Sequence, residues 1–299
     1  MSGTEATNPE PWTILRLLQW TTEHLKKTGS SSPRLDAEVL LAEARKCQRI
    51  ELYTAFAEEP NEEVKAKFRE WIKRRAAGEP VAYLVGKKEF YSLTFKVAKG
   101  CLIPRGETEH LIIECLDRAK AIRQAEPSRR LDIADVCTGS GCMAITMAKH
   151  LPNVSILAID ISTEALAIAQ SNIDLHQVGA TVRLLERDLL DGVDENSLDF
   201  VLSNPPYVSE SEFSRLDKSV RSHEPKIALV SGPSGTEIIE RLAAQSATKL
   251  RSSGWFLCEL SPMIANNVVE ILSSSGHWQD VGLVKDLAGL QRLAVARKK

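Results

Sequence analysis

Residues 131–150 join an apolar run, a glycine turn and a helical pattern, and this combination constrains the fold most strongly. The run 131–137 (LDIADVC) is typical of a short buried strand. Gly139, Gly141 and Ala144 follow it and match the G-x-G-x-x-G/A fingerprint. In that fingerprint one glycine makes a tight turn, another lets the backbone approach a ligand, and a small residue lets the helix pack closely. The segment therefore predicts a nucleotide site at the end of a strand.

A second apolar run, residues 155–160 (SILAID), ends on an acid about 20 residues after the turn, where the fingerprint places one. The carboxylate of Asp160 is expected to accept hydrogen bonds from both ribose hydroxyls of a bound nucleotide. Strand, glycine turn, helix, strand and acid together indicate nucleotide binding. They do not distinguish NAD from S-adenosylmethionine.

Beyond residue 100, helical patterns alternate with short apolar runs. The expected helices are 107–123, 142–150, 162–176, 234–251 and 263–274. The expected strands are 131–137, 155–160, 181–186, 198–203, 255–260, 279–284 and 292–297. Such alternation predicts an α/β fold with a mainly parallel, doubly wound sheet.

The chain before Gly78 has helical patterns only. Ser32 with Pro33, and later Asn61, are typical helix starts, and Gly78 is a typical helix stop. We therefore predict a helical bundle domain over residues 1–78. A Gly-punctuated, alternating segment follows and predicts a linker hairpin over residues 79–100, before an α/β domain over residues 101–299.

Asn204, Pro205, Pro206 and Tyr207 come directly after the apolar run 198–203 (LDFVLS). Because a proline pair cannot continue a sheet ladder, the strand must end there. Asparagine and proline carbonyls are acceptors suited to a planar NH2 group, and the tyrosine ring offers a flat surface against which such a group can lie. The tetrapeptide alone fits equally well a turn that only ends a strand.

Composition limits the function classes. A chain of 299 residues with 43% hydrophobic residues is long enough for about two domains. Its net charge of −2 argues against an extended nucleic-acid footprint, which needs a basic face. The first residues lack a targeting pattern, and no apolar run approaches the roughly 20 residues of a membrane span. The six cysteines contain no CxxC pair, so we expect a cytoplasmic protein with reduced thiols and no metal.

Five motifs in their order along the chain resemble one known family. They are residues 102–109 (LIPRGETE), the CTGSG turn, NPPY, residues 224–229 (EPKIAL) and residues 285–289 (KDLAG) followed by Arg292. The chain is similar to the HemK/PrmC protein-glutamine N5-methyltransferases of peptide-chain release factors, over nearly its whole length.

The resemblance implies a class I S-adenosylmethionine-dependent methyltransferase domain with a Rossmann-like, seven-stranded sheet. It also implies an N-terminal helical domain that helps to hold the release factor. Apart from the resemblance, we expect a monomer that contacts neither DNA nor membrane. The implied donor is S-adenosylmethionine. The implied acceptor is the glutamine of the GGQ motif in a class 1 release factor.

Residue roles follow from the same resemblance. The methionine part of the cofactor would be held by Cys137, Thr138, Gly139, Ser140 and Gly141. Asp160 would bind the ribose, and Asp188 and Leu189 would lie by the adenine. The substrate amide would be held, and the chemistry carried out, by Asn204, Pro205, Pro206 and Tyr207, with Asn204 also near the cofactor.

The sequence departs from the family pattern at several loop positions. The family usually has proline at Gly106, an aromatic residue at Leu189, a double glycine at Ser231 and Gly232, and an acid near Ser234. Leu260 and Ser261 replace the usual Ile-Gly pair. These departures affect the detailed loop geometry more than the chemistry.

Two other classes compete with the protein methyltransferase. NPPY would also grip the exocyclic amine of a flipped base, as in adenine N6 methyltransferases, but such an enzyme needs a basic cleft or a target-recognition domain. A nucleotide-binding module without methyl transfer, such as a dehydrogenase, is the third class. Three charged residues also have two interpretations, because Arg105, Glu107 and Glu109 either order the cofactor or cap the next helix. His223 is either catalytic or structural.

Overall fold

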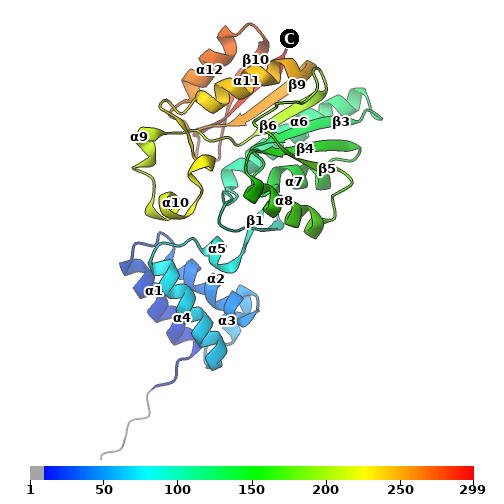
Figure 1. Ribbon diagram of the computed structural model, residues 1–299. Coiled ribbons are helices and arrows are strands. Elements are labelled where there is room, and N and C mark those ends of the chain that lie inside the picture. The colour runs from blue at the N-terminus through cyan, green and yellow to red at the C-terminus, as the bar shows by residue number, and fades with distance from the viewer. Residues whose placement is uncertain (1–9) are drawn as a thin grey trace, which may run out of the picture. The chain divides into compact units, whose positions relative to one another are not determined.

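The computed structural model describes residues 10–299. The chain divides into two compact units between Val85 and Gly86, and each unit is described by itself (Figure 1). No helix within the described range is long and apolar enough to cross a membrane.

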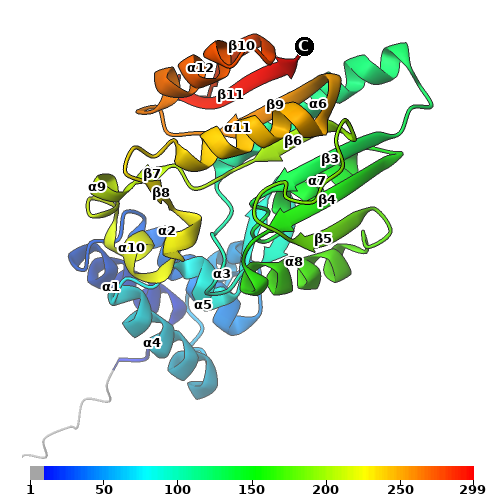
Figure 2. The same cartoon turned by 45° about the horizontal axis from the view of Figure 1, so that its top comes forward.

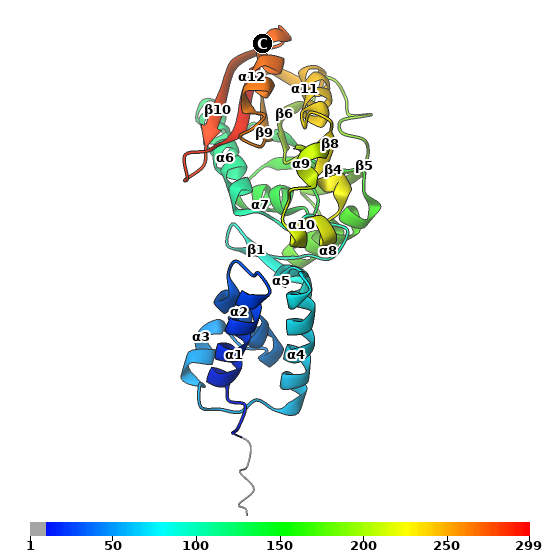
Figure 3. The same ribbon diagram turned by 90° about the vertical axis from the view of Figure 1, so that its left-hand side faces the viewer.

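The first unit is a bundle of helices. They are α1 (Ile14–Lys27), α2 (Pro33–Arg45), α3 (Arg49–Thr54), α4 (Glu62–Ala76) and α5 (Val81–Val85). Both predicted helix starts are confirmed: Ser32 is the N-cap residue before Pro33, and the Asn61 side chain accepts a hydrogen bond from the Val64 N–H at 2.9 Å. Helix α4 packs beside α1 and α2 around a core that includes Leu18, Leu40 and Phe68 (Figure 3).

The segment predicted as a linker hairpin has two parts. Residues 81–85 form helix α5, so the expectation of extended structure is wrong there. The Tyr83 and Leu84 N–H groups both bond the Pro80 carbonyl, which starts a helical turn. The hairpin itself is β1 (Lys87–Phe90) and β2 (Leu93–Lys96), paired antiparallel within the second unit. Its two turn residues, Tyr91 and Ser92, both have positive φ, as tight hairpins require.

The second unit contains a seven-stranded sheet in the order β10-β11-β9-β6-β3-β4-β5 (Figure 2). The strands are β3 (Leu131–Val136), β4 (Val154–Asp160), β5 (Val182–Glu186), β6 (Leu198–Ser203), β9 (Leu250–Glu259), β10 (Trp278–Lys285) and β11 (Gln291–Lys298). Five neighbouring strands, from β9 to β5, are parallel, and β11 pairs antiparallel with both β9 and β10. The predicted α/β class and mainly parallel sheet are confirmed.

Helices cover both faces of this sheet (Figure 2). They are α6 (Glu109–Ala125), α7 (Cys142–His150), α8 (Thr163–His176), α11 (Glu237–Lys249) and α12 (Ala265–Ser274). Because successive strand residues point to opposite faces, Ile133 packs under α6 and α7 while its neighbour Ala134 packs under α11 and α12. Each face therefore has its own apolar core.

The chain between β6 and α11 contains short elements that the sequence patterns did not predict. They are β7 (Val208–Ser209), α9 (Glu210–Phe213), α10 (Lys218–His223), the 3-10 turn η2 (Lys226–Ala228) and β8 (Val230–Gly232). None is long enough to show a periodic pattern. The end of this segment returns to its beginning because β8 pairs with β7. At Gly235 a Cβ atom would lie 2.8 Å from the Tyr207 carbonyl oxygen, so only glycine fits there.

Candidate active site

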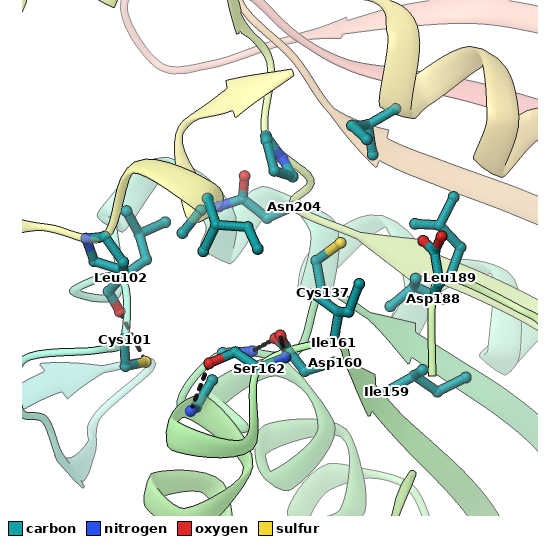
Figure 4. Close-up of a pocket in the computed structure, with 18 of the residues that line it drawn as sticks. Cys101, Leu102, Cys137, Ile159, Asp160, Ile161, Ser162, Asp188, Leu189 and Asn204 are labelled. Carbon is teal, nitrogen blue, oxygen red and sulfur yellow. Dashed lines mark hydrogen bonds between the residues drawn. The ribbon is translucent and has the colours of Figure 1, made fainter. Parts of the chain in front are cut away.

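The carboxyl ends of four parallel strands meet at one cavity, where open α/β sheets bind their ligands (Figure 4). Strand β3 contributes the glycine turn, β4 contributes Asp160, β5 is followed by Asp188 and Leu189, and β6 is followed by Asn204. These segments are distant in sequence, and the parallel pairing brings them to one edge of the sheet.

Two of the five glycine-turn residues line this cavity, namely Cys137 and Gly139. Cys137 has φ 59° and Gly139 has φ 55°, so the backbone turns sharply where it lines the cavity. Gly141 lies behind the turn, where a Cβ atom would be 3.3 Å from both Ala169 Cβ and Ile145 Cδ1. Thr138 and Ser140 are buried and do not line the cavity.

Asp160 is held in place by backbone donors. Its Oδ1 accepts the Ser162 N–H and its Oδ2 accepts the Gly139 N–H, both at 2.9 Å. Burial raises the pKa of Asp160, and the backbone hydrogen bonds oppose that rise. The Ile161 N–H also acts on this carboxylate, and because a carboxylate has about four acceptor positions, it keeps an acceptor position for a ligand hydroxyl.

The far wall of the cavity is largely apolar. Leu189 is 5% exposed and lies with Ile159 and Ile238 along this wall. The neighbouring Asp188 carboxylate is fixed by Arg241 at 2.6 Å. A flat ring system with polar edges fits such a surface. The apolar walls would contact the faces of the ring, and the Asp188 carboxylate would accept a hydrogen bond from its edge.

The NPPY loop is fixed from below by residues that the sequence patterns did not identify. The Asn204 side-chain nitrogen Nδ2 donates to Thr108 Oγ1 at 3.0 Å, and the Thr108 hydroxyl donates to Glu259 Oε2 at 2.6 Å. The Tyr207 hydroxyl donates to Glu259 Oε1 at 3.2 Å. Asn204 and Pro206 line the cavity that Asp160 borders, whereas Pro205 and Tyr207 do not.

Burial governs the ionisation of this group. Glu259 is 2% exposed, and desolvation raises its pKa to about 7 although Thr108 and Tyr207 both donate to it. Burial likewise raises the pKa of Tyr207, with a further rise from the nearby Glu259 charge. One signal for Glu259 was present in the sequence, because an acid at the end of the apolar run 255–260 is unusual for a buried strand.

The charged residues with two interpretations do not line the cavity. Arg105 pairs with Glu224 at 2.5 Å, and Glu224 also accepts the Ile103 N–H, so this pair anchors the segment before α6. Glu109 accepts the Tyr91 N–H at 2.9 Å. His223 ends α10, and its Nδ1 lies 3.1 Å from the Ser219 carbonyl oxygen. The contact of His223 fits its structural interpretation, whereas the contacts of Arg105 and Glu109 fix neighbouring segments without capping α6.

Loop departures from the family pattern also have local partners. Ser231 Oγ accepts the Ile238 N–H at 2.9 Å, and the Ser234 N–H and hydroxyl both donate to Glu237. These bonds close the first turn of α11. Leu189 adopts φ 55° and is buried against the apolar wall.

The strand order and the cavity at the strand ends are those of the class I methyltransferase fold. Solved structures with the same fold include the hMettl16 catalytic domain in complex with MAT2A 3'UTR hairpin 6, with a TM-score of 0.54 and 16% identity, covering 76% of this chain and 81% of that one. The delta-N METTL16 MTase domain matches with a TM-score of 0.51 and 18% identity, covering 70% of this chain and 89% of that one. At these identities the likeness concerns the fold alone.

Sequence comparisons identify the family. A model of the PrmC N-terminal domain matches residues 16–86, and a methyltransferase small domain model matches residues 109–220. Release factor glutamine methyltransferase from Rhodopirellula baltica is 48% identical over 98% of this chain and 99% of its own length. The relative of the same name from Koribacter versatilis is 40% identical over 92% of this chain and 95% of its own length. The chain belongs to the release factor glutamine methyltransferase family, which confirms the resemblance of the motifs.

Proposed function

We propose that this protein methylates the side-chain amide nitrogen of the GGQ glutamine in a class 1 peptide-chain release factor, with S-adenosylmethionine as donor. The observation that carries the proposal is the orientation of Asn204. Its nitrogen is engaged with Thr108, so its carbonyl oxygen is the group left to accept from a substrate NH2. This acceptor borders the same cavity as Asp160.

The residues around the cavity fit the cofactor. Cys137 and Gly139 line the cavity where the methionine end would lie, and the Asp160 carboxylate keeps an acceptor position for a ribose hydroxyl. Asp188 and the apolar wall beside Leu189 suit the adenine ring. When bound, S-adenosylmethionine supplies a methyl carbon that its sulfonium makes strongly electrophilic.

The chain's own task is alignment. A glutamine amide nitrogen is a weak nucleophile because its lone pair is delocalised into the carbonyl. Asn204 Oδ1 and the Pro205 carbonyl would accept its two N–H groups and favour loss of planarity, and such positioning lowers a barrier by several kcal/mol. The bound donor would supply the methyl group and keep the electron pair of its sulfur–carbon bond, and the substrate nitrogen would release one proton to solvent. The acceptors stabilise the positive charge on nitrogen in the meantime.

A protein substrate suits this chain better than a nucleic acid. A duplex requires several phosphate contacts, and the net charge is −2. The relatives that match along the full length carry names that specify a release factor glutamine. The N-terminal helical unit would then serve as a second contact for the folded release factor.

Mass spectrometry of the GGQ peptide tests the proposal directly. Purified class 1 release factor is incubated with S-adenosylmethionine, with and without the protein, and then digested. We expect the mass of one methyl group on the glutamine side chain only when the protein is present, and much less with the Asn204→Ala variant. Methyl groups in RNA or DNA, with none in the release factor under the same conditions, would contradict the proposal.

A further inference from the structure

Glu259 is the last residue of β9, and it reaches both ends of the NPPY loop. It bonds Tyr207 directly and Asn204 through Thr108. The pairing of Ser203 with Cys258 brings the ends of β6 and β9 together, so the carboxylate lies below the loop. Thr108 and Glu259 are each 2% exposed, and neither borders the cavity.

We propose that Glu259, in its ionised form, acts through Thr108 as a positioning residue that sets which end of the Asn204 amide faces the substrate. This inference rests on the proposed function and adds two residues to it. Neither residue touches the reacting atoms, so their effect is on the direction of the acceptor.

The hydrogen-bond inventory requires this direction. An ionised carboxylate only accepts, so the hydroxyls of Thr108 and Tyr207 must both donate to it. The 2.6 Å separation between Thr108 Oγ1 and Glu259 Oε2 is typical of a hydroxyl–carboxylate bond. The single Thr108 proton is then used, and its oxygen can only accept from Asn204. Asn204 Nδ2 therefore points toward Thr108, and within residues 10–299 no donor reaches Asn204 Oδ1.

Reversal of the Asn204 amide would disable the site. The two N–H groups of Asn204 would then face the glutamine amide, and no side-chain acceptor would be present. When Glu259 is protonated it can donate to Thr108, and the Thr108 hydroxyl is released to donate to Asn204 Oδ1. The orientation therefore depends on the charge of Glu259.

The charged and titratable groups around Glu259 come from several elements. Glu107 on the 3-10 turn η1 (Gly106–Thr108) raises its pKa, and Arg292 on β11 lowers it. The charge of Glu259 in turn raises the pKa of the Tyr207 hydroxyl and of the Cys142 and Cys258 thiols. Burial outweighs the stabilising contacts and raises the pKa of Glu259 to about 7, so its charge changes near neutral pH.

A matched set of variants tests the inference. Thr108→Val removes the hydroxyl at nearly constant shape, and Thr108→Ser restores it. Thr146→Val is the control, because Thr146 is equally buried but its hydroxyl bonds only the Cys142 carbonyl within α7. We measure kcat and KM for release factor methylation, and cofactor affinity by calorimetry.

We expect Thr108→Val to lower kcat by about 10- to 100-fold, because misplacement of an acceptor costs on that order. KM and cofactor affinity should change little, Thr108→Ser should recover most of kcat, and Thr146→Val should resemble the wild type. In the wild type, kcat should rise with pH through about 7. Glu259→Gln should be slow and lack that rise.

A second measurement does not depend on the substrate. Nuclear magnetic resonance of the Asn204 side-chain NH2, identified by its absence in an Asn204→Asp variant, should show slow proton exchange in the wild type and faster exchange in Thr108→Val. Equal kcat in Thr108→Val and Thr146→Val, or equal exchange of the NH2 group, would overturn the inference. Absence of glutamine methylation by the wild type would instead overturn the proposed function.

Discussion

Two carboxylates on neighbouring strands differ in what surrounds them. Asp160 on β4 is partly exposed at the cavity and bonds two backbone N–H groups. Asp135 on β3 is fully buried below the glycine turn, where its Oδ2 accepts from the Thr138 hydroxyl and the Ala144 N–H. The first is placed to meet a ligand, and the second supports the turn.

Substitution of Asp160 by alanine should weaken S-adenosylmethionine binding by about 10- to 100-fold. A hydrogen bond to a charged group contributes roughly 1.5 to 3 kcal/mol, and the variant loses the ribose acceptors. Calorimetric titration measures the change. Asp174→Ala, which removes an exposed carboxylate on α8, is the control. Unchanged affinity in a folded Asp160→Ala protein would rule out the ribose role.

The buried Asp135 should make stability depend on pH. Burial raises its pKa from 3.8 to about 7, so over that range the folded state keeps a proton that the unfolded state has released. Its contribution to stability is complete below pH 3.8 and is lost as the pH rises to about 7.

The Asp135→Asn variant isolates this contribution, because asparagine does not ionise. The free energy of unfolding of the variant minus that of the wild type should increase by about 1.4 kcal/mol for each pH unit in that range. Urea unfolding at several pH values measures it. A difference that stays constant with pH would show that Asp135 is not protonated in the folded state.

At the scale of elements, α8 connects the hairpin to the glycine turn. The Asn172 side chain is fully buried and accepts the Lys96 N–H at 2.7 Å. Its nitrogen donates to the carbonyls of Lys96 and Ser140 at 3.0 and 2.9 Å. One side chain thus satisfies backbone groups of β2 and of the turn, neither of which is its sequence neighbour.

Asn172→Ala should lower the free energy of unfolding by about 3 kcal/mol, because buried backbone groups lose their partners and each such loss costs roughly 1 to 3 kcal/mol. Chemical denaturation measures the loss. Asn266→Ala, at an exposed position on α12, should change stability by less than about 0.5 kcal/mol. If the two variants were equally stable, Asn172 would not support the turn.

At the scale of the whole molecule, each unit has its own apolar core. The helical unit packs around residues of α1, α2 and α4, and the second unit packs on both faces of its sheet. Every residue that lines the candidate cavity belongs to the second unit. Cofactor binding and recognition of a folded partner should therefore be separable.

Deletion of residues 1–85 should leave S-adenosylmethionine affinity within about twofold of the full chain. Methylation of folded release factor should fall by roughly 100-fold in kcat/KM, because a second contact raises apparent affinity by about that factor. Methylation of a short GGQ peptide, which is too small to use both contacts, should change little. Equal losses for the protein and the peptide would contradict a recognition role for the helical unit.

The order of strands and helices in the second unit could be predicted because its elements are long enough to carry a periodic pattern. Strand β6 and helix α7 begin and end where the patterns predicted. The short elements between β6 and α11 could not be predicted, because segments of two to six residues show no period. Helix α5 was missed because a five-residue helix depends on its local turn bonds.

The sequence by itself predicted the motifs that border the cavity: the glycine turn, through Cys137 and Gly139, Asp160 after the next strand, and the NPPY loop, through Asn204 and Pro206. These motifs are contiguous, so their residue types and spacing express the chemistry directly. The tertiary structure alone decided that Thr108 and Glu259 contact the NPPY loop. Thr108 is 96 residues from its partner Asn204 along the chain, and Glu259 is 52 residues from its partner Tyr207. Parallel pairing of β6 with β9 brings Glu259 next to the NPPY loop, and burial at that position raises the pKa of Glu259. No local pattern records a contact between strand ends so far apart in sequence.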